Sequence, residues 1–259
     1  MRIKYLFIIS YISYALTISA ERPVFFISIP KAGTHLLSKC LSLLTGKGFV
    51  SNLHGVEFNG IINYSKIKEL QGSIIFHKHL PHNQSAKEFI KKANLNTFFI
   101  IRDPRDQIVS LAYWVYKNPE SFEDLYKLNM NDLILNLIEK NNAKRKAYES
   151  INSYREYVGW INEPGIHLVR FENLIGEKGG GSLDKQIKEI YKILERLGLK
   201  SNIGNIKSVA NSLWGEAASF REGKIGSWKS HFTSQHIVVF KQTFGQLLID
   251  LGYEKDLNW

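Results

Sequence analysis

One short stretch, FFISIPKAGTHLL over residues 25–37, constrains the fold more than any other part of the sequence. An apolar β-type run breaks at Pro30 into a turn of small residues led by Lys31, and an apolar helix-like stretch begins at His35. In such a unit the N–H groups of the turn and of the first helical turn converge on one point, where a lysine adds a full positive charge. The pattern therefore predicts an anion site. An ordinary strand-to-helix turn would show the same residues, and the lysine precedes the glycine, unlike in the G-x-x-x-x-G-K-[ST] nucleotide loop.

A second pattern of this kind is FFIIRDPRDQIVSLAYW, residues 98–114. Arg102 follows an apolar strand directly, and ligands of open parallel sheets bind outside the carboxyl ends of the strands. We therefore expect Arg102 at the same crevice as Lys31, where its planar guanidinium would fit phosphate oxygens. Ser110, about two helical turns on, can add a hydroxyl donor. The alternative is that residues 102–106 form a solvated cap of alternating charges.

The third pattern is ASFREGKIGSWKSHFT, residues 218–233. Its arginine and glycines indicate a flexible basic loop, and Ser234 is expected to cap an amphipathic helix that runs to about Leu251. The alternative is a basic surface loop without a ligand.

Together with FHKHLP at residues 76–81, these segments resemble the signature set of sulfotransferases that use 3′-phosphoadenosine-5′-phosphosulfate (PAPS). They follow the family's order from about residue 24 to residue 233. The resemblance implies that PKAGTHL binds the 5′-phosphosulfate, that Arg102 and Ser110 bind the 3′-phosphate, and that the C-terminal segment closes over the nucleotide. It further implies that His79 is the catalytic base and that Ser110 holds Lys31 back until the acceptor binds. The implied donor site comprises Lys31, Ala32, Gly33, Thr34, His35, Leu36, Arg102, Ser110, Phe171, Phe220, Arg221, Glu222 and Gly223.

The sequence departs from the family's pattern at several of these positions. Leu36 replaces a tryptophan that stacks on adenine, Phe171 replaces a tyrosine, and Glu222 replaces the lysine of R-K-G. His77 stands where the family has a lysine, two positions before the catalytic histidine. These changes concern the affinity for the donor more than the type of reaction.

The chemistry of transfer points to the same residues. As the sulfuryl group moves, negative charge builds up on the leaving 5′-phosphate, which Lys31 is placed to stabilise. His79 has an intrinsic pKa suited to accepting a proton near neutral pH. A metal site is the rival interpretation of His77, His79 and His82. No cysteine lies near them and no carboxylate flanks them closely, so we expect no metal cofactor.

Apolar runs and helix-like stretches alternate along the chain. Strands are expected at 24–29, 73–77, 97–101 and 166–171, and helices at 35–45, 85–93, 104–117, 182–197 and 234–251. Such alternation predicts an α/β protein, here a three-layer fold like that of P-loop NTPases, with a central parallel sheet flanked by helices. Residues 131–160 read as a polar helical region and 176–181 as a surface loop. One domain is expected over residues 22–259.

Competing functions are a P-loop kinase-like phosphotransferase and a degenerate, non-catalytic nucleotide-binding protein. The net charge of +10 comes from scattered lysines, which favours anionic ligands in general and predicts no nucleic-acid partner. The sulfate acceptor, which carries a hydroxyl or an amine, and the oligomeric state stay open. Residues 1–21 are expected to be a signal-like or packing segment, and no firm membrane association is expected for the protein. We expect a cytoplasmic enzyme, with the secretory pathway or Golgi lumen as the alternative.

Overall fold

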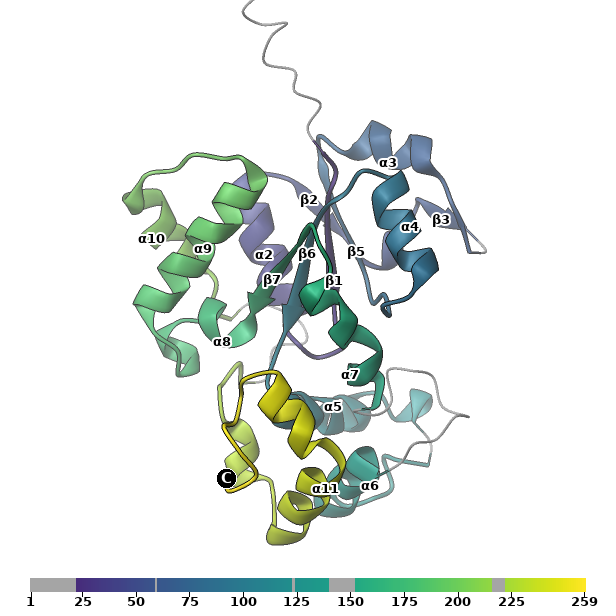
Figure 1. Cartoon of the computed structure of the whole chain (residues 1–259), viewed down its shortest axis with the longest axis vertical. Helices are drawn as coiled ribbons and strands as arrows, with labels where there is room; N and C mark the ends of the chain where they lie inside the picture. The colour runs from purple at the N-terminus through teal and green to yellow at the C-terminus, as the bar shows by residue number, and fades with distance from the viewer. Residues whose placement is uncertain (1–21, 59, 123, 140–151, 216–221) are drawn as a thin grey trace, which may run out of the picture.

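A computed structural model of the chain describes residues 22–58, 60–122, 124–139, 152–215 and 222–259 (Figure 1). The signal-like segment at residues 1–21 lies outside the described residues, and so do Phe220 and Arg221 of the predicted donor site.

A parallel sheet of five strands stands at the centre of the described part of the chain, in the order β2-β5-β1-β6-β7. The strands are β2 (Gly48–Val50), β5 (Ile74–Lys78), β1 (Val24–Ser28), β6 (Asn96–Ile101) and β7 (Ile166–Arg170). The predicted α/β architecture with a central parallel sheet is confirmed. The short edge strand β2 was not predicted. Because β1 lies between β5 and β6, the loops that follow these three strands meet at one edge of the sheet.

Helices cover both faces of the sheet (Figure 1). The helices α2 (Thr34–Thr45), α9 (Leu183–Leu197) and α10 (Ile203–Ser212) lie on one side, and α3 (Tyr64–Leu70), α4 (Gln84–Lys92) and α7 (Asn152–Tyr157) lie on the other. Alternate strand residues serve the two sides: Phe26 and Phe98 pack toward α2 and α9, whereas Phe25 and Phe99 pack toward α4. Cys40 is fully buried on α2, as expected for a small apolar residue.

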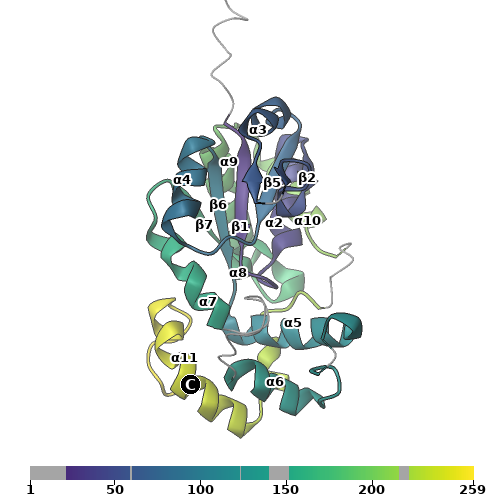
Figure 2. The same cartoon turned by 90° about the vertical axis from the view of Figure 1, so that its right-hand side faces the viewer.

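A further group of helices lies beyond the carboxyl ends of the strands (Figures 1 and 2). It consists of α5 (Pro104–Lys117), α6 (Met130–Glu139) and α11 (Ser234–Asp250). Apolar residues of these helices, such as Val115, Leu133 and Phe240, continue the core from the sheet. The N-cap of α11 is Thr233, which forms a capping box with His236, so the expected cap at Ser234 is one residue off.

Of the predicted helical region 131–160, the structure describes residues 131–139 and 152–160, where Leu133, Tyr154 and Trp160 are fully buried and Asn131 and Asp132 are exposed. One sequence expectation needs correction. The glycine-rich stretch 176–181 is more than a surface loop. The carbonyl of Gly179 accepts a hydrogen bond from the N–H of Ile225, with an N···O distance of 2.9 Å. A Cβ atom on Gly179 would lie only 2.7 Å from the carbonyl oxygen of Gly223, so this stretch packs tightly against the C-terminal segment.

The remaining elements are small. A hairpin of β3 (Glu57–Phe58) and β4 (Ile61–Ile62) follows β2, and α8 (Phe171–Leu174) follows β7. None of the helices within the described ranges is long and apolar enough to cross a membrane.

Candidate active site

A cavity of about 710 Å³ opens where the loops after β1, β5, β6 and β7 come together. The predicted site residues that line it are Lys31, Gly33, Thr34, His35, Leu36, His79, Arg102, Ser110, Phe171, Glu222 and Gly223. Ala32 is not among its lining residues. Its side chain is fully buried, and its N–H donates to the carbonyl of Ile29 at 3.0 Å. The structure thus brings together nearly all of the predicted site residues that it describes.

The turn after β1 is held in a special backbone conformation. Lys31 has φ 68° and Gly33 has φ 113°, both in the left-handed region that non-glycine residues seldom adopt. A Cβ atom on Gly33 would lie 2.9 Å from the ring of Phe171, so a glycine is needed there for space as well. The side-chain amide of Gln107 donates to the carbonyl of Pro30 at 2.7 Å. Since α2 begins at Thr34, its first N–H groups point toward this end of the cavity, which suits an anion.

The ammonium group of Lys31 lies in a partly desolvated, positively charged environment. Burial, and to a smaller extent the charges of Lys117 and Arg102, together lower the pKa of Lys31 from its usual 10.5 to about 8. Its Nζ atom lies 4.3 Å from the ring centroid of Trp114. Lys31 is therefore mostly protonated at neutral pH but loses its proton more easily than a surface lysine.

His79 directly follows β5, and its orientation fixes its tautomer. The Nδ1 atom lies 2.7 Å from the carbonyl oxygen of Ser28. A carbonyl can only accept, so Nδ1 carries the proton and donates it, which leaves Nε2 as the basic nitrogen. Burial lowers the pKa of His79, the hydrogen bond to Ser28 raises it in part, and the nearby charge of Lys31 lowers it. Because its pKa is lowered, His79 stays neutral, and able to accept a proton, at pH values where an ordinary histidine would already be protonated.

The Ser28 hydroxyl connects Thr34, at the end of the turn after β1, to both histidines. Its Oγ atom lies 2.7 Å from Thr34 Oγ1, 2.9 Å from His77 Nε2 and 3.2 Å from His79 Nδ1. His77 is fully buried, and its Nδ1 atom lies 3.2 Å from Ser51 Oγ. Burial lowers the pKa of His77 to about 2, with the charges of His79 and His35 acting in the same direction. His77 is therefore neutral and does not replace the cation that the family carries at this position.

The third histidine of the predicted cluster lies apart. His82 Nε2 lies 2.9 Å from Glu163 Oε2, its ring packs edge-on against Trp160, and it is not among the residues that line the cavity. No group of three or more His, Cys, Asp or Glu side chains in the described ranges is placed to hold a metal ion.

Arg102 is 7% exposed and is oriented by contacts on two sides. Its Nη2 atom donates to the carbonyl of Lys224 at 2.9 Å, and its guanidinium carbon lies 4.3 Å from the ring centroid of Phe171. Phe171 directly follows β7 and also packs against Gly33. The Phe171 ring thus contacts both the turn after β1 and Arg102.

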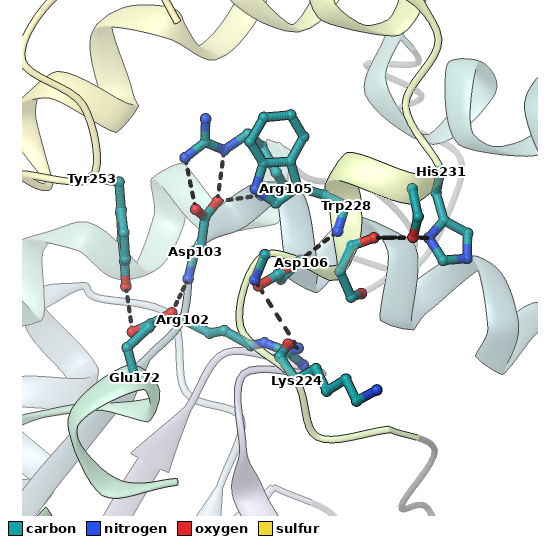
Figure 3. Close-up of polar contacts among 12 residues, drawn as sticks. Arg102, Asp103, Arg105, Asp106, Glu172, Lys224, Trp228, His231 and Tyr253 are labelled. Carbon is teal, nitrogen blue, oxygen red and sulfur yellow. Dashed lines mark hydrogen bonds and ion pairs between the residues drawn. The ribbon is translucent and has the colours of Figure 1, made fainter. Parts of the chain in front are cut away.

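The charged residues after β6 form a buried network, so the alternative of a solvated cap is wrong (Figure 3). Asp106 accepts the N–H groups of Gly226 at 2.7 Å and of Trp228 at 2.9 Å. Arg105 pairs with Asp103, and its guanidinium carbon lies 4.2 Å from the ring centroid of Trp228. These contacts anchor residues 224–228 beside Arg102.

A buried carboxyl group extends this network toward the C-terminal end of the sequence. Glu172 accepts the N–H of Asp103 at 2.7 Å and the hydroxyl of Tyr253 at 3.2 Å (Figure 3). Burial raises the pKa of Glu172 to about 6. Helices α5, α8 and the segment after α11 are thereby tied together behind the cavity.

Sequence analysis did not single out several residues that the structure places at the site. Trp114 lies four residues after Ser110, a spacing that puts both on one helix face and could have revealed it. Ser28 ends β1 and could have been found from its place at the carboxyl end of a strand. Ser51 and Phe122 carry no such signal, because they come from irregular connections.

Comparison with known proteins adds an independent result. The sequence matches the sulfotransferase domain family over residues 21–252. It is 25% identical to a 3-beta-hydroxysteroid sulfotransferase of Cavia porcellus, covering 89% of this chain and 84% of the relative. It is 23% identical to an amine sulfotransferase of Oryctolagus cuniculus, covering 91% and 84%. The crystal structure of mouse sulfotransferase SULT7A1 complexed with PAP superposes with a TM-score of 0.63 at 20% identity, covering 91% of this chain and 88% of the other.

Proposed function

The chain belongs to the sulfotransferase domain family and is a PAPS-dependent sulfotransferase, and from this premise we propose which residues bind the donor and which carry out the transfer. The observation that carries the proposal is the meeting of Lys31, His79 and Arg102 around one cavity, each from the end of a different strand. Two cations and a neutral histidine at one crevice suit a doubly phosphorylated donor and a nucleophile that must lose a proton.

In this proposal, the turn after β1 and Arg102 bind different ends of the donor. Lys31 and the first N–H groups of α2 hold the 5′-phosphosulfate, and Arg102 and Ser110 hold the 3′-phosphate. Gly223 and Glu222 form the adjoining wall. Glu222 brings a negative charge to that wall, so the side-chain cation at the 3′-phosphate comes from Arg102.

His79 acts as the base. Its Nε2 atom accepts the proton of the acceptor's hydroxyl or amine while the acceptor atom bonds to sulfur and the bond from sulfur to the phosphate oxygen breaks. The electron pair of that bond stays on the 5′-phosphate, where Lys31 stabilises the added negative charge. The carbonyl of Ser28 keeps Nδ1 protonated and so keeps the basic nitrogen at Nε2.

We propose that the transfer proceeds without a metal ion. Lys31, Lys39 and Arg102 supply the positive charge at the cavity, and among the lining residues in the described ranges Glu222 is the one carboxylate. Mg²⁺ would serve to compensate the charge of the donor's phosphates, and the lining cations already supply that charge. We also propose a cytoplasmic location, because the donor nucleotide is made in the cytosol.

The acceptor is proposed to occupy the part of the cavity that Phe122, Ser51 and Asn52 line. The named relatives act on hydroxysteroids and on amines, which supports a hydroxyl or amine acceptor for this enzyme as well.

The role of Arg102 is tested by comparing two nucleotides. Calorimetry on the wild-type protein is expected to show tighter binding of 3′,5′-adenosine bisphosphate than of adenosine 5′-monophosphate, because only the former has a 3′-phosphate. Arg102→Ala should weaken bisphosphate binding by about 10- to 100-fold, the value of one charge-assisted contact, and leave the monophosphate nearly unchanged. Arg102→Lys keeps the charge but loses the planar fork, so its affinity for the bisphosphate should lie between those of the wild type and Arg102→Ala.

If Arg102→Ala weakens the binding of both nucleotides equally, Arg102 does not bind the 3′-phosphate. Arg102 would then act by holding the carbonyl of Lys224 and the segment around it. Circular dichroism on each variant separates either result from unfolding.

A further inference from the structure

Lys31 and Trp114 form a contact inside the cavity that neither the reaction nor the donor site requires. The Nζ atom of Lys31 lies 4.3 Å from the ring centroid of Trp114, within the range of a favourable cation–π interaction. Trp114 is half-buried on α5, one helical turn after Ser110, and lines the same cavity. The two residues come from separate elements, so the fold itself brings them together.

The surroundings of Lys31 explain why its ammonium group benefits from an aromatic face. Lys117 and Arg102 repel the charge, and burial removes much of its hydration. His35 and His79 also interact with it electrostatically. The lining carboxylate is Glu222, which lies on the C-terminal segment of the cavity wall. The negative face of an indole ring offsets part of this unfavourable environment without forming a salt bridge that would compete with the donor.

We propose that Trp114 is a positioning residue whose ring seats the Lys31 ammonium in the cavity, so that the charge required by the donor's 5′-phosphate is held in place. This inference rests on the proposed function, in which Lys31 contacts that phosphate. When the donor binds, the Lys31 ammonium can exchange its contact with the Trp114 ring for one with the phosphate, because a cation–π contact is weaker than a charge-assisted phosphate contact.

Removing the Trp114 ring is expected to change the pH dependence of donor binding in one direction. The ring favours the charged form of Lys31, so removing the ring lowers the pKa of Lys31 below its present value of about 8. Affinity for a 5′-phosphate, which needs the charged form, would then be lost at a lower pH. The second ionisation of the phosphate itself lies near pH 6, well below the pH at which Lys31 loses its proton.

The test is calorimetric binding of 3′,5′-adenosine bisphosphate to the full chain between about pH 6.5 and 9.5, which needs no acceptor. The wild-type affinity should stay level and then fall as the pH passes about 8. In Trp114→Leu this fall should begin about half a unit to one unit lower. Trp114→Phe keeps an aromatic face and should behave like the wild type. Trp114→Met, a second apolar replacement, should follow Trp114→Leu.

Two controls separate the inference from the proposed function. Lys31→Met should remove the alkaline fall altogether; if the fall remains, Lys31 does not contact the phosphate and the proposed function fails. If Lys31→Met removes the fall but Trp114→Leu and Trp114→Met leave it in place, the Trp114 inference alone is overturned. Tyr64→Leu removes a comparable contact with Lys92, at 4.5 Å and away from the cavity, and should change nothing. A shift in this variant would also overturn the inference.

Discussion

Replacing Lys31 by methionine is expected to lower sulfuryl transfer by at least about a hundredfold, the usual loss when one preorganised charge stabiliser is removed. Methionine has nearly the length of lysine but carries no charge, so it tests the ammonium group rather than the volume. The leaving 5′-phosphate gains negative charge in the transition state, and Lys31 is the cation that its own loop provides. The loss should therefore appear mainly in kcat, with a smaller loss of affinity for 3′,5′-adenosine bisphosphate.

Initial rates of PAPS turnover, with an acceptor found by screening alcohols, phenols and amines, give the measurement. Lys31→Arg is the matched variant. It keeps the charge and should recover part of the activity, although the planar guanidinium fits the turn less well. Full activity in Lys31→Met would rule out Lys31 as the electrostatic catalyst.

His79→Ala is expected to abolish transfer while it leaves nucleotide binding within about twofold of the wild type. General-base catalysis contributes about a hundredfold to ten-thousandfold, and His79 is the histidine at the cavity whose basic nitrogen is set by a backbone contact. Because burial lowers the pKa of His79, the wild-type rate should decline on the acid side only below the usual histidine value. As pH falls through that pKa, Nε2 becomes protonated and the base is lost.

His82→Ala is the matched control for this variant. His82 pairs with Glu163 outside the cavity lining, so transfer should continue. If His79→Ala transfers the sulfuryl group at the wild-type rate, the base is another group: His35, which also lines the cavity, or His77, His82 or a carboxylate. His77 is fully buried and hydrogen-bonded through both ring nitrogens, which makes it the weakest of these.

The sequence predicted the parts of the site that depend on strand ends. Lys31, His79 and Arg102 each follow a strongly apolar strand, and the parallel arrangement of β1, β5 and β6 brings the ends of these strands to one edge. Strand and helix positions were right where the apolar pattern was strong, as in residues 24–29 and 104–117. The edge strand β2 was missed because three half-exposed residues leave no pattern.

The contacts that depend on tertiary packing could not be predicted. Burial of the charged residues 102–106 follows from their enclosure by Trp228, Trp259 and Tyr253, more than a hundred residues away in the sequence. The contact of Gly179 with residues 223–225 is of the same kind. Single-sequence patterns report the local period and the local turn, and they carry no information on which distant segment covers a charge.

The structure shows which contacts are made by two residues that depart from the family's pattern. His77 replaces a lysine but is neutral, and it instead holds the hydroxyls of Ser28 and Ser51. Phe171 replaces a tyrosine and stacks on Arg102. The positive charge near the transferred group thus rests more heavily on Lys31 than the family's pattern implies.

The most direct test of the donor site is calorimetric binding of 3′,5′-adenosine bisphosphate to the full chain without metal, with Mg²⁺-ATP as the comparison. We predict that the bisphosphate binds without metal and that Mg²⁺-ATP binds much more weakly, because Lys31 and Arg102 are placed for two separate phosphate groups. Preference for Mg²⁺-ATP would contradict the account in favour of a phosphotransferase. Absence of binding to either nucleotide would contradict it in favour of a degenerate domain.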